Sequence, residues 1–108
     1  MMAKKSKSQT NTDSDVLVID RNEVTRPSLY KVIMHNDNFS TMDFVVEVLC
    51  TIYKHPINKA NDLTQLIHTS GRAVAGTYIK EIAESKVIQT HNLARKREFP
   101  LKCTLEKE

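Results

Sequence analysis

The hydrophobic pattern of the chain changes its period abruptly after His35. Residues 29–35 alternate, with Tyr30, Val32 and Met34 on one side, which predicts a half-buried β-strand. Soon afterwards the apolar side chains recur at helical spacing, at Met42, Val45, Val46, Leu49, Ile52 and Tyr53. The chain must therefore pass from a strand into a helix through a short polar turn. Ser40 followed three residues later by Asp43 has the pattern of a capping box at that helix start.

Two further elements are predicted from the punctuation that follows. Pro56 ends the first helix, and a second helix is expected over residues 57–69. Gly71 stands where a helix favours a left-handed C-cap. Residues 72–77 are small and compatible with a strand.

The last part of the chain predicts one more helix and one more strand. Residues 78–94 have helical spacing, with an expected buried stripe of Ile79, Ile82, Ala83 and Val87. Glu81 and Lys86 lie off that stripe and are expected to face solvent. Residues 101–106 alternate as a half-buried strand. The order β-α-α-β-α-β predicts an α+β fold, with three helices on one face of a three-stranded antiparallel sheet.

Length and composition favour a single small domain with an extension. Residues 1–26 are polar apart from an apolar cluster at 16–20, so we expect a mobile N-terminal extension and a folded core over residues 27–108. No apolar run approaches the roughly 18 residues of a membrane span. Cys50 and Cys103 are expected to be reduced thiols. The four histidines show none of the paired spacings of zinc motifs, so neither a metal nor a cofactor is expected.

The polar turn between the first strand and the first helix allows two interpretations. Asn36, Asp37 and Asn38 are residues that favour turns, because their side chains bond the local backbone. The same oxygens could instead hold a cation such as an ammonium group. His68, near the end of the second helix, is either a surface residue or a further acceptor for that cation.

Several apolar or nearly apolar positions have a similar double interpretation. They are Met42, Val45, Thr64, Ile67 and Leu101. By residue type alone they belong to the core, but a hydrophobic hollow with polar groups at its mouth is the usual form of a small-ligand site. Catalysis has little support, since no local signature joins Asp37, His68 and Ser70, or Cys50 and a histidine, into a nucleophile system. The basic residues 95–97 leave open a small RNA- or ribosome-associated binding module.

Four sequence blocks resemble one protein family. They are "RPSLYKVIMHNDNFSTMDFVVEVL", "LIHTSGRAVAGTY", "EIAESKV" and "FPLKCTLEKE", in the family's order and with its gaps over residues 26–108. The chain resembles the bacterial and plastid Clp protease adaptor, ClpS. The resemblance implies a fold like the C-terminal domain of a ribosomal stalk protein, and an adaptor rather than an enzyme.

The resemblance also implies a substrate class and partners. Family members bind N-degron substrates that begin with Leu, Phe, Tyr or Trp and deliver them to the AAA+ unfoldase of the Clp protease. The implied partner is the N-terminal domain of that unfoldase, which is of the ClpA or ClpC type. It implies no nucleic-acid or membrane partner, a monomer, and a bacterial cytoplasmic location, or the plastid stroma for a plant or algal source. The extension over residues 1–26 corresponds to the family's mobile segment that engages the unfoldase.

Roles follow from the resemblance residue by residue. Asn36, Asp37 and His68 fall on the positions that bind the substrate's α-amino group, with Asn38 and Ser40 near the rim. The positions that line the side-chain pocket correspond to Met42, Val45, Thr64, Ile67 and Leu101. Glu81 and Lys86 fall on the surface that docks the unfoldase.

The chain departs from the family pattern at three positions. Asn38 replaces a second acid, which predicts a weaker preference for basic residues after the N-terminal one. Thr41 stands where proline is common, which affects the helix entry. Thr64 stands where a methionine often narrows the pocket, which predicts a roomier or more tolerant pocket.

Overall fold

The computed structural model describes residues 27–108, so the expected extension and its apolar cluster at 16–20 lie outside the described residues. The described elements are β2 (Leu29–His35), α1 (Met42–Thr51), α2 (Ile57–Ser70), β3 (Arg72–Ile79), α3 (Lys80–Lys96) and β4 (Lys102–Lys107). The predicted order β-α-α-β-α-β is confirmed. The strand β3 continues to Ile79, past the predicted end at Thr77, so α3 starts and ends two residues later than predicted.

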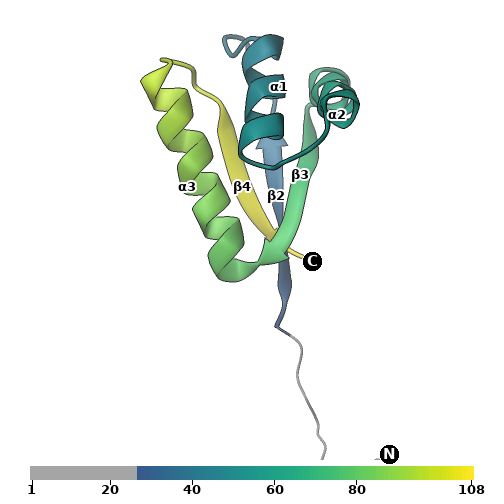
Figure 1. The fold of residues 1–108 in the computed structure, drawn as a ribbon, viewed down its shortest axis with the longest axis vertical. Helices are drawn as coiled ribbons and strands as arrows, with labels where there is room; N and C mark the ends of the chain where they lie inside the picture. The colour runs from purple at the N-terminus through teal and green to yellow at the C-terminus, as the bar shows by residue number, and fades with distance from the viewer. Residues whose placement is uncertain (1–26) are drawn as a thin grey trace, which may run out of the picture.

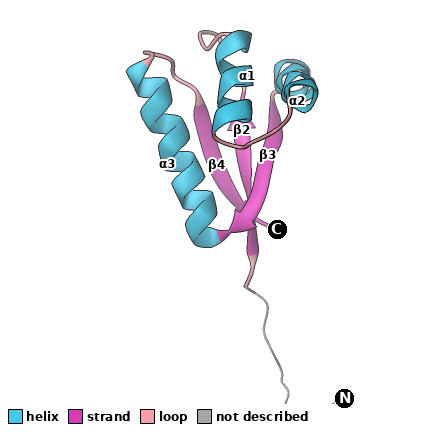
Figure 2. Ribbon diagram, viewed as in Figure 1, coloured by secondary structure: helices cyan, strands magenta, loops and turns pink. Residues whose placement is uncertain are grey.

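The strands form one antiparallel sheet, and the helices lie together on one of its faces (Figure 1, Figure 2). Within residues 27–108 the sheet has three strands in the order β3-β2-β4, so the first strand of the sequence is the central one. The buried face of β2 presents Val32 and Met34 to the helices, and both side chains are fully buried. This arrangement confirms the predicted α+β fold. Its physical reason is that the apolar face of a sheet must be buried, and here the helices cover it.

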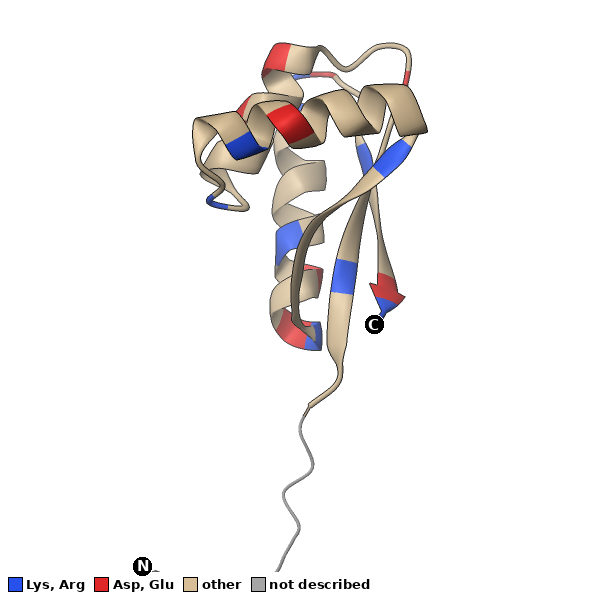
Figure 3. Ribbon diagram, turned by 90° about the vertical axis from the view of Figure 1, so that its right-hand side faces the viewer, with Lys and Arg blue, Asp and Glu red and all other residues tan. Residues whose placement is uncertain are grey.

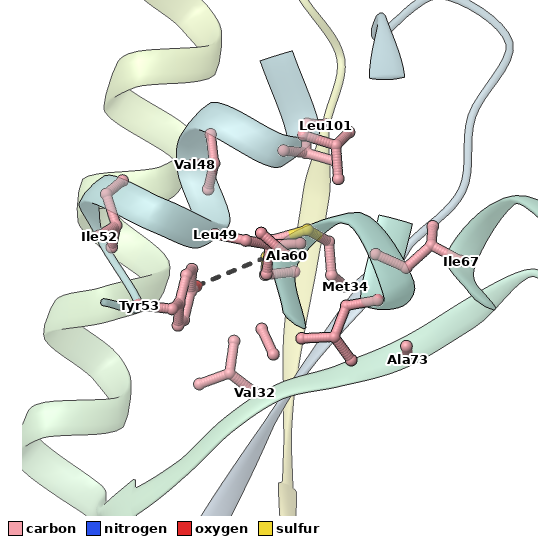
Figure 4. Packing of buried hydrophobic residues seen from close by; sticks show 14 of the residues in the cluster. Val32, Met34, Val48, Leu49, Ile52, Tyr53, Ala60, Ile67, Ala73 and Leu101 are labelled. Atoms are coloured by element: carbon pink, nitrogen blue, oxygen red, sulfur yellow. Dashed lines mark hydrogen bonds between the residues drawn. The ribbon is translucent and has the colours of Figure 1, made fainter. Parts of the chain in front are cut away.

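The core lies between the sheet and the three helices. Figure 4 shows Leu49 and Ala60 of the helices close to Met34 of the central strand. One polar pair crosses this core, since the Tyr53 hydroxyl lies 2.8 Å from the Thr90 hydroxyl. A buried hydroxyl needs such a partner, because leaving it unpaired would cost free energy.

The buried stripe of α3 differs from the prediction. Ile79 and Ile82 are 38% and 45% exposed, whereas Ala83, Thr90 and Ala94 are buried. Small side chains at the contact allow a helix to approach a sheet closely. The helix therefore turns its small residues inward. The predicted burial of Ala83 is confirmed, whereas that of Ile82, and of Ile79 at the end of β3, is wrong.

Two predictions about helix ends also change. Pro56 does not end the first helix, because α1 ends at Thr51 with Ile52 as its C-cap, and Pro56 is instead the N-cap of α2. The N-cap of α1 is Thr41, whose hydroxyl accepts a hydrogen bond of 3.1 Å from the Phe44 N–H, so the predicted capping box at Ser40 is wrong by one residue.

Lys86 is half-buried instead of facing solvent. Its ammonium donates a 2.7 Å hydrogen bond to the Ile52 carbonyl at the C-cap of α1, where a cation complements the helix dipole. Glu81 is exposed, as predicted.

Candidate functional site

A cavity of about 270 Å³ opens where the β2–α1 loop meets α1 and α2. Its lining residues are Asn36, Asp37, Asn38, Ser40, Met42, Val45, Thr64, Ile67 and His68. The structure thus brings together the predicted polar residues and all but one of the predicted pocket residues. Leu101 is the exception.

Leu101 is not among the residues that line this cavity. Its side chain is 4% exposed, belongs to the same core cluster as Val45 and Ile67, and lines a second cavity beside α3. It comes directly before β4, so it supports the core from the start of that strand. Its place in the side-chain pocket stays a prediction.

A backbone hydrogen bond joins the polar loop to the end of α2. The Asn36 N–H donates to the Gly71 carbonyl over 2.9 Å. Gly71 has a φ of 91°, in the left-handed region that glycine reaches without strain, and its own N–H caps the Ile67 carbonyl. The sequence identified Gly71 as a helix cap, but its second role in holding the loop beside His68 was not predicted. A glycine after an amphipathic helix was the only signal for it.

Asp37 uses its two carboxylate oxygens differently. One oxygen, Oδ1, accepts hydrogen bonds from the Phe39 and Ser40 N–H groups, at 2.8 and 2.6 Å. The other, Oδ2, is shielded from solvent and has no hydrogen-bond partner among residues 27–108, and the same holds for the Ser40 hydroxyl oxygen. Both interpretations of the sequence can therefore apply to one side chain, because one oxygen shapes the turn and the other remains free for a donor.

The electrostatics of the cavity favour a cation. Burial alone would raise the pKa of Asp37, but the hydrogen bonds from the Ser40 and Phe39 N–H groups, together with the nearby Ser40 hydroxyl, outweigh it, so the pKa lies below the usual value and the carboxylate is charged at neutral pH. Among residues 27–108, no lysine or arginine lines the cavity. The cavity also lies beside the last turn of α2, which contains His68, and the partial negative charge of that helix C-terminus attracts a bound cation.

The opposite wall of the cavity is apolar. Val45 and Ile67 are buried, while Met42 is 43% exposed at the mouth. Thr64 is buried, and its hydroxyl donates a 2.8 Å hydrogen bond to the Ala60 carbonyl. Since that hydroxyl is satisfied inside its own helix, Thr64 does not need a polar partner in the cavity.

The arrangement offers little to a catalyst. Neither a cysteine nor Ser70 lines the cavity beside Asp37 and His68. Over residues 27–108 no group of three His, Cys, Asp or Glu side chains could hold a metal ion. In the same part of the chain no helix has the length and apolar character needed to span a bilayer. Residues of both charge signs are interspersed in Figure 3, so this view shows no continuous basic face of the kind that RNA binding favours.

Comparison with known proteins gives a consistent result. Residues 25–104 match the family model described as "ATP-dependent Clp protease adaptor protein ClpS". The ATP-dependent Clp protease adapter protein ClpS of Lawsonia intracellularis is 45% identical over 84 residues, which is 78% of this chain and 77% of that protein. The adapter ClpS of Desulfotalea psychrophila is 45% identical over 95 residues, covering 88% of this chain and 93% of that protein.

A solved structure is also similar. Agrobacterium tumefaciens ClpS2 bound to L-phenylalaninamide matches with a TM-score of 0.74 and 32% identity, over 77% of this chain and 100% of that one. The matched family is one of adaptors, which bind and present other proteins instead of transforming them. The predicted family is therefore confirmed: this chain belongs to the ATP-dependent Clp protease adaptor family, ClpS.

Proposed function

We propose that the cavity at the end of α2 captures the first residue of proteins that begin with a bulky apolar side chain, so that this adaptor can deliver them to the AAA+ unfoldase of the Clp protease. The observation behind the proposal is that Asp37 lines a cavity that is polar on one side and apolar on the other, and that its Oδ2 has no hydrogen-bond partner among residues 27–108. L-phenylalaninamide, the ligand of the similar Agrobacterium protein, has both a free amino group and an apolar side chain.

The amino group is the part of the ligand that the polar side would select. A chain terminus at neutral pH is an ammonium with three N–H donors, whereas an internal peptide N–H is neutral and has one. Asn36, Asp37 and His68 offer several acceptors at once, so only a true terminus satisfies them together. An internal residue would leave the buried Asp37 Oδ2 unpaired, at a cost of about 1–3 kcal/mol.

The first side chain would lie against the apolar wall formed by Met42, Val45, Thr64 and Ile67. Apolar contact stabilises a bound side chain in proportion to the area it removes from water, by about 25 cal/mol per Å². Leu, Phe, Tyr and Trp gain most from such a wall. Thr64 supports a wall that also accepts branched side chains, since it is shorter than methionine.

The surface for the unfoldase is proposed around Glu81 and Lys86 of α3. Glu81 is exposed and can contact a partner directly. Lys86 is committed to the Ile52 carbonyl and lies 5.6 Å from the centre of the Tyr78 ring, so its part is to hold this surface in shape. We infer that Lys86→Met weakens unfoldase binding by distorting the surface, whereas Glu81→Gln weakens it without loss of stability.

The remaining features of the proposal concern the whole chain. We infer a folded adaptor core over residues 27–108 and an extension over residues 1–26 that engages the unfoldase. The adaptor is proposed to act as a monomer in the bacterial cytoplasm, with a ClpA- or ClpC-type partner and without nucleic acid. Affinity for a single terminal residue is expected to be modest, because association entropy offsets a small contact.

A binding titration tests the proposal. The full chain is titrated against C-terminally labelled peptides that begin with Phe, Leu or Gly, with fluorescence anisotropy as the readout. Phe and Leu peptides should bind, and N-acetylation of the Phe peptide should abolish binding. Equal binding of acetylated and free peptides would contradict the proposal, and steeply salt-dependent binding of RNA would favour the alternative class.

A further inference from the structure

A second open cavity lies between the C-terminal end of α3 and the start of β4. Its volume is about 310 Å³. The floor is apolar and consists of Ala94, Phe99, Pro100 and Leu101. The polar side chains around it are His91, Arg95 and Lys102. We name this cavity the α3–β4 groove.

The α3–β4 groove has an excess of positive charge. Residues 91–102 include four Lys or Arg side chains and one carboxylate, Glu98. Arg97 is neutralised by Glu47 through a 2.7 Å ion pair. Within residues 27–108 no carboxylate lies within ion-pair distance of Arg95 or Lys102, which are both exposed at the groove. Arg95 donates a 2.8 Å hydrogen bond to the neutral Asn92 amide oxygen, so neither cation has its charge balanced within the described residues, and both can attract an anionic partner.

His91 lines the groove together with the two cations, and its ring is neutral at neutral pH. Its Nε2 accepts a 3.0 Å hydrogen bond from the Cys103 N–H, so that nitrogen carries no proton. Burial, and after it the charges of Arg95 and Lys102, lower the pKa of His91. The imidazole therefore fixes the start of β4 and does not add a third charge at neutral pH.

The α3–β4 groove shares no lining residue with the cavity of the proposed site, but the sheet brings one end of it close to that cavity. Lys102 is the register partner of His35 on the neighbouring strand, and His35 is followed directly by Asn36. Paired residues on antiparallel strands have Cα atoms about 5 Å apart, so the Cα atoms of Lys102 and Asn36 are within roughly 9 Å. An extended peptide covers that distance in about three residues.

We propose that the α3–β4 groove binds acidic side chains that follow the N-terminal residue of a substrate, through Arg95 and Lys102. This inference rests on the proposed function, because it needs the substrate's first residue in the cavity beside Asn36. Asn38 acts in the same direction, since it lines that cavity with an amide and adds no negative charge that would repel an acidic substrate. The adaptor then distinguishes substrates that share the same first residue.

The test compares peptides that differ only downstream of the first residue. Each begins with Phe-Ala and continues with two or three residues that are either Asp and Glu or Asn and Gln, and all have the same C-terminal label. At low ionic strength the acidic peptides should bind about three- to tenfold more tightly than the neutral ones, as expected for two exposed ion pairs. The difference should shrink at high salt, which screens exposed charges.

Variants of the full chain separate the groove from net charge. Arg95→Gln and Lys102→Gln should each remove part of the gain and leave the neutral peptides unaffected. Lys96→Gln is the matched control, since Lys96 is exposed at the same end of α3 but does not line the groove. It should preserve the gain.

Two results would overturn the inference alone. One is equal affinity for acidic and neutral peptides while both still bind. The other is an equal loss of the gain in Lys96→Gln and Arg95→Gln, because the gain would then reflect overall charge. Failure of the neutral Phe peptide to bind at all would instead refute the proposed function, and this inference with it.

Discussion

The substitution Asp37→Asn tests the amine site with the least change of shape. An asparagine oxygen can keep the position of Oδ1 and still accept the Phe39 and Ser40 N–H groups, so the turn is preserved. In place of Oδ2 the side chain then presents an NH₂ group, which is a donor facing a donor when an ammonium binds. The fold is retained and the charge is lost.

The expected loss of affinity follows from these contacts. A hydrogen bond to a charged group contributes about 1.5–3 kcal/mol, and the facing donors prevent any compensation. Since about 1.4 kcal/mol corresponds to a tenfold change, Asp37→Asn should weaken binding of a Phe-initiated peptide by roughly 10- to 150-fold. Stability should fall by less than about 1 kcal/mol, because a neutral acceptor still serves the two turn donors.

The assay is an anisotropy titration paired with urea unfolding of the same protein. Asp43→Asn is the control, since it removes an exposed acid from the first turn of α1 that does not line the cavity. It should bind as the parent chain does. Binding of Asp37→Asn within twofold of the parent, with equal stability, would refute the assignment of Oδ2 to the amine.

Three further perturbations have distinct expected results. Thr64→Met should narrow the cavity and weaken the binding of peptides that begin with Ile or Val more than the binding of those that begin with Leu. If the parent chain binds peptides that begin with Ile and Val no better than one that begins with Gly, the prediction of a tolerant pocket is wrong. Gly71→Ala should destabilise the fold by about 1–2 kcal/mol in urea, since only backbone strain at φ 91° is added and open space surrounds the new methyl group. Because the pKa of His91 is lowered in the fold, the native state binds fewer protons than the unfolded chain, and stability should fall as pH drops through the ordinary histidine range near about 6.5. His91→Gln should flatten that pH dependence in thermal unfolding, and an unchanged profile would show that other groups cause it.

Local patterns determined most of the elements. The alternation at residues 29–35 and the helical spacing after Met42 depend only on neighbouring residues, and β2 and α1 begin where these patterns begin. Pro56 and Gly71 stand at the two ends of α2, for backbone reasons that hold in any fold. The matched family and the set of candidate residues also follow from residue identity and order, which is why both could be named before any coordinates.

Only the tertiary structure decided how these elements face one another. The spacing within α3 is compatible with more than one buried face, and packing against the sheet buried Thr90 and Ala94 beside the predicted Ala83 while leaving Ile82 exposed. The Asn36–Gly71 hydrogen bond and the free oxygen of Asp37 depend in the same way on distances between segments. So does the partial burial of Lys86 against the end of α1. Periodicity describes each element about its own axis, whereas a binding site depends on the relative placement of several elements, which a local pattern does not encode.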